Sequence, residues 1–133
     1  MTENKDCLCS AAPKLLFPCS GAADVGEIAD RAARKLTADG DGKMYCLAGV
    51  GGRISVIIEN TLAASKVVAI DGCSLNCAAR TLRQAGIKGF DHIRLEDLGM
   101  EKGKSPVSEQ NIERVASATR AILSQEIEDT AVK

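Results

Sequence analysis

Cysteines are the residues of this chain whose chemistry says most about its function. The chain has 133 residues and six cysteines, of which Cys7 and Cys9 lie near the N-terminus. The other four are spread along the chain, at Cys19, Cys46, Cys73 and Cys77. A thiolate is a ligand for zinc and other soft metals, and it is a nucleophile when its pKa is low. The four spread cysteines are therefore the first candidates for a functional site.

The compartment decides what cysteines do, because disulfides form mainly outside the reducing cytosol. The N-terminus is polar and lacks the apolar segment of a signal peptide. No stretch approaches the roughly 20 apolar residues of a membrane span. We therefore expect a cytoplasmic protein that does not bind membranes. Its thiols would be metal ligands, redox groups or buried side chains rather than disulfides.

The charge balance bears on the choice of partner. The chain has 17 basic and 18 acidic residues, a net charge of −1, and 2% aromatic residues. A nucleic-acid surface needs clustered Lys and Arg, and often stacking rings. We therefore expect no nucleic-acid partner. The composition leaves the oligomeric state open.

Short apolar runs alternate with helical patterns along the chain. Strands are predicted at residues 15–17, 44–48, 67–70 and 92–95, and helices at 24–36, 54–63, 75–82 and 108–126. The third strand is apolar at every position, which is typical of a strand covered on both faces. The alternation predicts an α/β three-layer sandwich with a small, mostly parallel four-stranded sheet of flavodoxin-like or Rossmann-like type. The expected strand order is 2-1-3-4.

The domain organisation follows from the same patterns. Residues 1–12 are predicted to be a flexible polar tail that carries Cys7 and Cys9. Residues 13–133 are predicted to form a single α/β metal-binding domain, because the chain length suits one domain. The tail could pass a soft metal to the site by ligand exchange, although two incidental thiols are the simpler interpretation.

The predicted elements place the four cysteines at one edge of the sheet. Cys19 follows the first strand, Cys46 lies near the end of the second, and Cys73 follows the third. Cys77 is expected one helical turn after Cys73. The C-terminal ends of parallel strands share an edge, where open α/β sheets hold their ligands. Zinc takes four thiolates in a tetrahedron, so the sequence predicts a zinc site here, with Asp71 among the outer partners of its ligands.

The sequence also resembles the DGC-domain family of zinc-binding proteins. The resemblance rests on Asp71-Gly72-Cys73, on Cys77 and Cys19-Ser20-Gly21, and on the segment from Cys46 to Gly52. It spans roughly residues 13 to 104, including Leu98-Gly99-Met100-Glu101-Lys102. It implies that Cys19, Cys46, Cys73 and Cys77 bind zinc. It does not imply an activity, and Cys7 and Cys9 fall outside it.

Two other functions use the same thiols, so whether the chain is an enzyme stays open. In a thiol-based redox enzyme, Cys73 would be the nucleophile and Cys77 or Cys19 the resolving thiol. An iron–sulfur protein would use the four thiolates, but their spacing fits neither common ferredoxin pattern. A zinc protein would act in metal handling or sensing, with a metal-exchange partner protein.

Two further features have plain structural interpretations. The glycines at 49, 51 and 52 precede a predicted helix and could cradle a phosphate, but a tight turn is the better explanation. His92 is the only histidine, and it is expected to be an ordinary residue at the edge of a strand.

Overall fold

The structure is a computed structural model that describes residues 12–125. The predicted tail, except for its last residue, and both Cys7 and Cys9 lie outside the described residues. Within the described range, no helix is long and apolar enough to cross a membrane.

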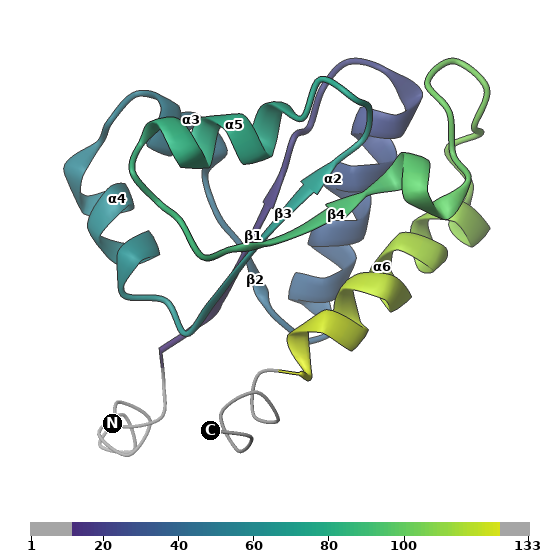
Figure 1. Cartoon of the computed structure of the whole chain (residues 1–133). Coiled ribbons are helices and arrows are strands. Elements are labelled where there is room, and N and C mark those ends of the chain that lie inside the picture. Colours follow the sequence, from purple (N-terminus) through teal and green to yellow (C-terminus); the bar gives the residue numbers. More distant parts are fainter. Residues whose placement is uncertain (1–11, 126–133) are drawn as a thin grey trace.

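The described chain forms a four-stranded parallel sheet with helices around it (Figure 1). The strands are β1 (Lys14–Pro18), β2 (Lys43–Met44), β3 (Lys66–Asp71) and β4 (Asp91–Arg94). The helices are α2 (Asp24–Ala38), α3 (Leu47–Gly51), α4 (Ser55–Leu62), α5 (Cys77–Gln84) and α6 (Glu109–Leu123), with a 3-10 turn η1 (Leu95–Leu98) after β4. The strand order is β2-β1-β3-β4, which confirms the predicted order.

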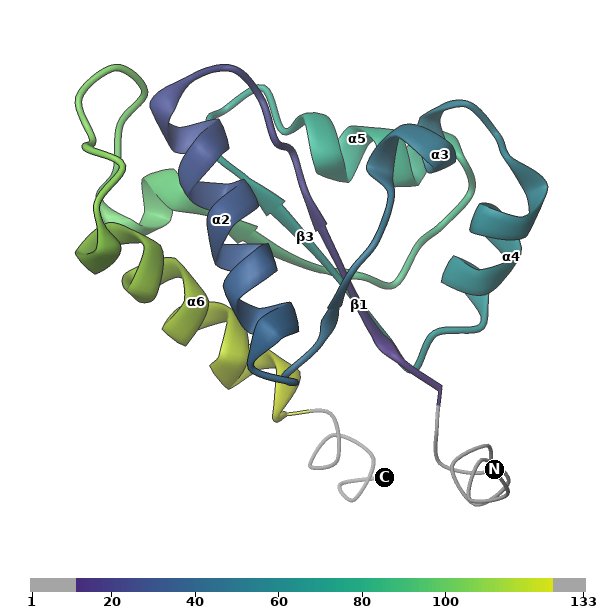
Figure 2. The same ribbon diagram turned by 180° about the vertical axis from the view of Figure 1, so that it is seen from behind.

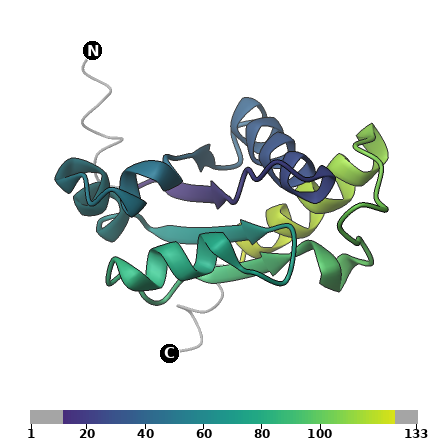
Figure 3. The same ribbon diagram turned by 90° about the horizontal axis from the view of Figure 1, so that it is seen from above.

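All neighbouring strands pair in parallel, so their C-terminal ends lie at one edge. The view from above shows the arrowheads of β1, β3 and β4 pointing the same way (Figure 3). From that edge the chain runs into α2, into the loop before α5, and into η1. This is the edge at which the sequence places the cysteines.

The sheet has a hydrophobic core on each face, as the predicted three-layer sandwich requires. Helices α2 and α6 cover one face, and α3, α4 and α5 lie on the other side (Figures 1 and 2). Alternate residues of β1 serve the two cores: Leu16 packs with α2 and α6, while Leu15 and Phe17 pack with the α5 side. All three are at most 1% exposed, because both faces of a parallel strand are covered.

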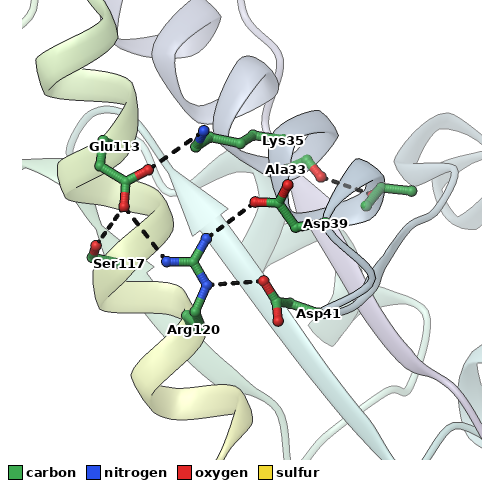
Figure 4. A network of polar contacts seen from close by, with 8 residues as sticks. Ala33, Lys35, Asp39, Asp41, Glu113, Ser117 and Arg120 are labelled. Atoms are coloured by element: carbon green, nitrogen blue, oxygen red, sulfur yellow. Dashed lines mark hydrogen bonds and ion pairs between the residues drawn. The ribbon is translucent and has the colours of Figure 1, made fainter.

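An ion-pair network joins α2 to α6 at the opposite end of the sandwich (Figure 4). The Arg120 side chain donates to Asp41 through Nε at 2.8 Å, and its other nitrogens reach Asp39 and Glu113. The hydrogen bond to Asp41 is the main reason that the pKa of Arg120 is raised. Because Asp39 and Asp41 follow the C-terminus of α2, the network lies away from the carboxyl edge of the sheet.

Two predicted elements differ from the structure around the second strand. The strand β2 ends at Met44, so Cys46 lies beyond it rather than near its end. The predicted glycine turn is the short helix α3, whose N-cap is Cys46. The Cys46 sulfur accepts a hydrogen bond from the Gly49 N–H, which stabilises a first turn that its glycines alone would not favour.

The start of the third predicted helix also differs from the structure. The helix predicted from residue 75 begins only at Cys77, and Leu75 is 60% exposed in the preceding loop. Helix α2 begins at Asp24, as its periodicity indicates, but its N-cap Ala23 makes no side-chain cap. Ser108 caps α6 as predicted, by accepting from the Asn111 N–H at 3.1 Å.

Candidate metal centre

Cys19 joins the end of β1 to the loop after β3. Its N–H donates to the Ile70 carbonyl at 2.9 Å, which extends the pairing of the two strands. Its sulfur accepts a hydrogen bond from the Gly72 N–H, with an N···S distance of 3.4 Å. The side chain is partly buried and packs against both cores of the sandwich. Cys19 therefore sits where the two central strands end.

Cys46 shares a pocket with Cys19. The pocket has a volume of about 490 Å³ and is also lined by Ser20, Asp30, Arg34, Tyr45 and Thr81, among others. The Cys46 side chain is exposed, and its sulfur lies 3.3 Å from the Gly49 nitrogen that donates to it. Backbone N–H groups thus already donate to two of the four candidate sulfurs, as they do to the ligands of metal–thiolate centres.

Cys77 opens helix α5 and is exposed. Burial is the main cause of the raised pKa of the Cys19 thiol, and Cys77 lies close enough to add a smaller electrostatic contribution. Thr81, one turn further along α5, lines the pocket that Cys19 and Cys46 share. Cys77 therefore belongs to the same side of the carboxyl edge as these two cysteines.

Cys73 lies in the loop before α5 and faces a different pocket. That pocket has a volume of about 360 Å³, and Glu96, Glu101 and Lys102 also line it. Cys73 packs against the core on the α2 and α6 face. The expectation that Cys73 and Cys77 occupy consecutive turns of one helix is wrong, because the helix begins only at Cys77.

The four thiols are gathered at one edge but are not arranged as a finished metal site. Between residues 12 and 125, no group of three or more His, Cys, Asp or Glu side chains could hold a metal ion as it stands. The donor chemistry nevertheless suits a soft metal, since four sulfurs are available and two already accept N–H hydrogen bonds. Binding of one metal ion by all four would require the sulfurs to come closer together.

The electrostatic surroundings keep Cys19 protonated. Burial is the main reason that the pKa of the Cys19 thiol is raised, and electrostatic interactions with Asp71 and Cys77 act in the same direction. The N–H groups of Gly21 and Gly72 oppose this shift without cancelling it. A cation bound among the sulfurs would lower the pKa of the Cys19 thiol instead, because metal coordination favours the thiolate.

Asp71 has a role that the sequence did not reveal. Its carboxylate, 1% exposed, accepts from the N–H groups of Ala78 at 2.7 Å and Ala79 at 3.1 Å. These are first-turn amides of α5, so Asp71 caps that helix from the end of β3. His92 Nε2 lies 2.8 Å from the same carboxylate. Among the described residues, the hydrogen bonds of Asp71 therefore go to the helix that begins with Cys77 and to His92, and not to a sulfur.

The contact between His92 and Asp71 had only a faint signal in the sequence. His92 is paired with Ala69 across β3 and β4, and Asp71 is two residues beyond Ala69. Side chains two residues apart on a strand share a face, so the two groups are diagonal neighbours. The contact can be predicted only when the register of β3 and β4 is known.

Between residues 12 and 125, three residues other than glycine adopt the left-handed conformation, and each borders a cysteine segment. They are Ser20 (φ 53°), Arg53 (φ 59°) and Asn76 (φ 55°). Ser20 follows Cys19, Asn76 precedes Cys77, and Arg53 follows the helix that Cys46 caps. Such backbone strain is concentrated at functional sites more often than elsewhere.

The glycine segment after Cys46 serves packing rather than phosphate binding. A Cβ atom at Gly49 would lie 2.9 Å from the Ile57 side chain, so helices α3 and α4 could not approach as they do. Arg53, which follows the glycines, donates to the carbonyls of Val50 and Gln84 and so ties α3 to the end of α5. The interpretation as a packed turn of the chain is the better one.

Comparisons with known proteins add two findings. A family model described as the DGC domain matches residues 15–119, which is most of the chain. A curated relative from Pseudomonas aeruginosa, named "Anaerobic and virulence modulator AnvM", is 30% identical over 88 residues, which are 66% of this chain and 67% of that protein. No solved structure matches the chain significantly.

Proposed function

Because the chain belongs to the DGC domain family, we propose that it binds a zinc ion through the thiolates of Cys19, Cys46, Cys73 and Cys77. One observation carries the proposal: at the carboxyl edge of the sheet, the sulfurs of Cys19 and Cys46 face one pocket and both accept backbone N–H hydrogen bonds. Such hydrogen bonds stabilise a coordinated thiolate. The other two cysteines are carried by the adjoining loop and helix.

The charges around Cys19 favour a metal over a free reactive thiolate. Burial raises the pKa of the Cys19 thiol, and electrostatic interactions with Asp71 and Cys77 act in the same direction. A bound zinc ion supplies the positive charge that this environment lacks, and the thiols lose their protons when it binds. Zinc affinity is therefore expected to rise with pH.

The exposure of the ligands favours a role in metal handling or sensing. Cys46 and Cys77 are exposed, so a partner's thiols could reach them and exchange the metal stepwise. Cys73 lines a separate pocket with Glu101 and Lys102, so its use as a ligand would change the surface around these two residues. The relative from Pseudomonas aeruginosa is named a modulator, which is consistent with a regulatory rather than a catalytic role.

The alternative, a redox enzyme with Cys73 as the nucleophile, has less support. A helix N-terminus lowers a cysteine pKa when its free N–H groups face the sulfur. Here the Ala78 and Ala79 N–H groups of α5 donate to Asp71 instead. The reason for expecting an activated thiolate at Cys73 is therefore removed.

The test of the proposal is metal analysis of the full-length protein purified without added metal. We expect about one zinc ion per chain, and Co²⁺ substitution should give the visible and charge-transfer absorption of tetrahedral thiolate coordination. Each single Cys→Ser change at the four positions should lower zinc affinity by more than about tenfold, since it removes a ligand.

The matched control is the double variant C7S/C9S, which removes two thiols that the proposal does not use. It should keep the zinc content and the cobalt spectrum of the wild type. The proposal is contradicted if the wild type binds neither metal, or if the four single variants keep the wild-type affinity. A brown protein with iron and sulfide would assign the same thiols to an iron–sulfur cluster.

A further inference from the structure

Asp71 is a buried carboxylate with three polar partners on three sides. The residue ends β3, its Oδ1 and Oδ2 accept from the N–H groups of Ala78 and Ala79, and His92 Nε2 approaches Oδ2. The distances are 2.7, 3.1 and 2.8 Å respectively. A buried carboxylate is costly unless it is paired, and these partners compensate it. Asp71 thus joins β3, α5 and β4 at a single side chain.

The residue that would normally cap α5 does not do so. Asn76 occupies the N-cap position but is left-handed, and its side chain makes no cap hydrogen bond. Its Oδ1 is buried without a hydrogen-bond partner among the described residues. Asparagine is one of the best N-cap residues, so its replacement by a distant aspartate is unusual. Asp71 reaches over the whole loop between Cys73 and Cys77 to take its place.

This arrangement fixes both ends of the cysteine loop. At one end, Asp71 accepts hydrogen bonds from the first turn of α5, which begins with Cys77. At the other end, Gly72 contacts both Cys19 and α2. Gly72 donates to the Cys19 sulfur, and a Cβ atom there would lie 2.8 Å from the Val25 backbone at the start of α2. Both ends of the loop from Cys73 to Asn76 are therefore anchored to neighbouring elements.

We propose that Asp71 is a positioning residue for the metal site, and that His92 acts with it by holding its carboxylate. The proposal rests on the proposed zinc function. Asp71 anchors the first turn of α5 and thereby fixes the position of Cys77 at the carboxyl edge of the sheet. With Nε2 protonated, the His92 ring donates to Oδ2 and keeps both carboxylate oxygens aimed at the helix.

The test compares D71N with a variant that loses a helix cap elsewhere. Asp71→Asn keeps the shape of the side chain but replaces one of its two acceptor oxygens with an NH₂ group. Ser108→Ala removes the cap of α6, a contact of the same kind that lies on a different helix. Both variants should unfold at lower temperature than the wild type, so stability alone does not distinguish a positioning role from a structural one.

The distinguishing readout is the spectrum of bound Co²⁺, recorded at a temperature at which every variant is folded. D71N should shift the ligand-field and charge-transfer bands and weaken zinc binding by about tenfold, because the helix that carries Cys77 would lose its cap. S108A should keep the wild-type bands and bind zinc within about twofold of the wild type. H92L should shift the bands in the same direction as D71N, and H92Q, which keeps an N–H donor, should restore them.

The outcomes separate this proposal from the proposed function. If the wild type binds neither Co²⁺ nor zinc, the proposed function fails and this proposal fails with it. If the wild type binds both metals but D71N shows the wild-type bands and affinity, only the positioning role of Asp71 is overturned. If S108A shifts the bands as D71N does, the effect is one of general stability, and the positioning role is likewise overturned.

Discussion

At the scale of single residues, close backbone contacts determine how the loops that carry Cys19 and Cys73 pack against α2. Gly72 lies against the start of α2, and its N–H reaches the Cys19 sulfur. Gly26, on α2, lies against Gly21, where a Cβ atom would be 2.4 Å from the Gly21 carbonyl oxygen. Glycine at positions 26 and 72 lets the loops after β1 and β3 approach α2 at backbone distance.

The first prediction concerns Gly72→Ala. The added Cβ would lie 2.8 Å from the Val25 backbone, and this contact cannot be relieved by the rotation of a flexible side chain. We expect a loss of unfolding free energy of about 1–3 kcal/mol, measured by urea denaturation. The matched control is Gly21→Ala, because a Cβ atom at Gly21 would have nothing within 4 Å. Equal effects of the two variants would contradict the packing argument.

At the scale of elements, the loop after η1 is held against α2 by one carboxylate. Asp24 accepts from the N–H groups of Gly103 at 2.9 Å and Ser105 at 3.1 Å, as well as from Val25. The Gly103 hydrogen bond is the main reason that the pKa of Asp24 is lowered. The loop matters for the site because Glu101 and Lys102 line the pocket of Cys73.

The second prediction is a pH dependence of this loop. Because the folded-state pKa of Asp24 is lowered, its stabilising effect is complete above the ordinary value of 3.8 and is lost as pH falls through the folded value. The amide resonances of Gly103 and Ser105 should therefore shift with a midpoint below 3.8. D24N should abolish that titration and speed hydrogen exchange in the loop at neutral pH.

The control for this experiment is D30N. The pKa of Asp30 is also lowered: burial acts to raise it, but hydrogen bonds from Ser20 and Arg34 outweigh burial. Asp30 makes no hydrogen bond to the loop, so D30N should leave the Gly103 and Ser105 titration unchanged. A titration that persists in D24N would show that another group governs the loop.

The sequence predicted the long elements better than the short ones. The uniformly apolar run ending in Ile70 and the helical spacing in α2 and α6 reflect burial, which is encoded locally. Helix α3 has five residues, including two glycines, and its start depends on the Cys46 sulfur as a cap. A side-chain cap of this kind leaves no periodicity in the sequence, so the segment was predicted to be a strand and a turn.

The site was predictable only to the level of the sheet edge. Parallel topology dictates that the segments after β1 and β3 meet, and the Cys19–Gly72 hydrogen bond lies at that junction. The separate pocket of Cys73 and the contact of Asp71 with His92 depend on loop conformation and strand register, which no local pattern encodes. The common use of all four cysteines stays a prediction.

At the scale of the whole molecule, the two cores determine how metal and fold are coupled. Each face of the sheet has its own cluster of buried apolar side chains, and these clusters do not depend on the cysteines as ligands. Zinc fingers, in contrast, have too little core to fold without metal. This domain should therefore keep its fold when the metal is removed.

The third prediction follows from these two cores. Chelation of the purified protein should leave the far-ultraviolet circular dichroism nearly unchanged, while zinc should raise the unfolding temperature. Linkage predicts about 2.7 kcal/mol of added stability when free zinc is at 100 times its dissociation constant. The C19S variant should show little of this zinc-dependent rise. Loss of the helical signal on chelation would show that the cores are insufficient.

The strand order also has a consequence during protein synthesis. Of the four described strands, β1 leaves the ribosome before the others, yet it lies inside the sheet and pairs with residues 43–44 and 66–70. It has no strand partner while α2 is being made, and its longer pairing must wait until β3 has emerged. Cys19 and Cys46 are therefore translated before the helix that begins with Cys77 exists. If the proposed site binds a metal through all four cysteines, its loading would therefore have to follow the emergence of α5 from the ribosome.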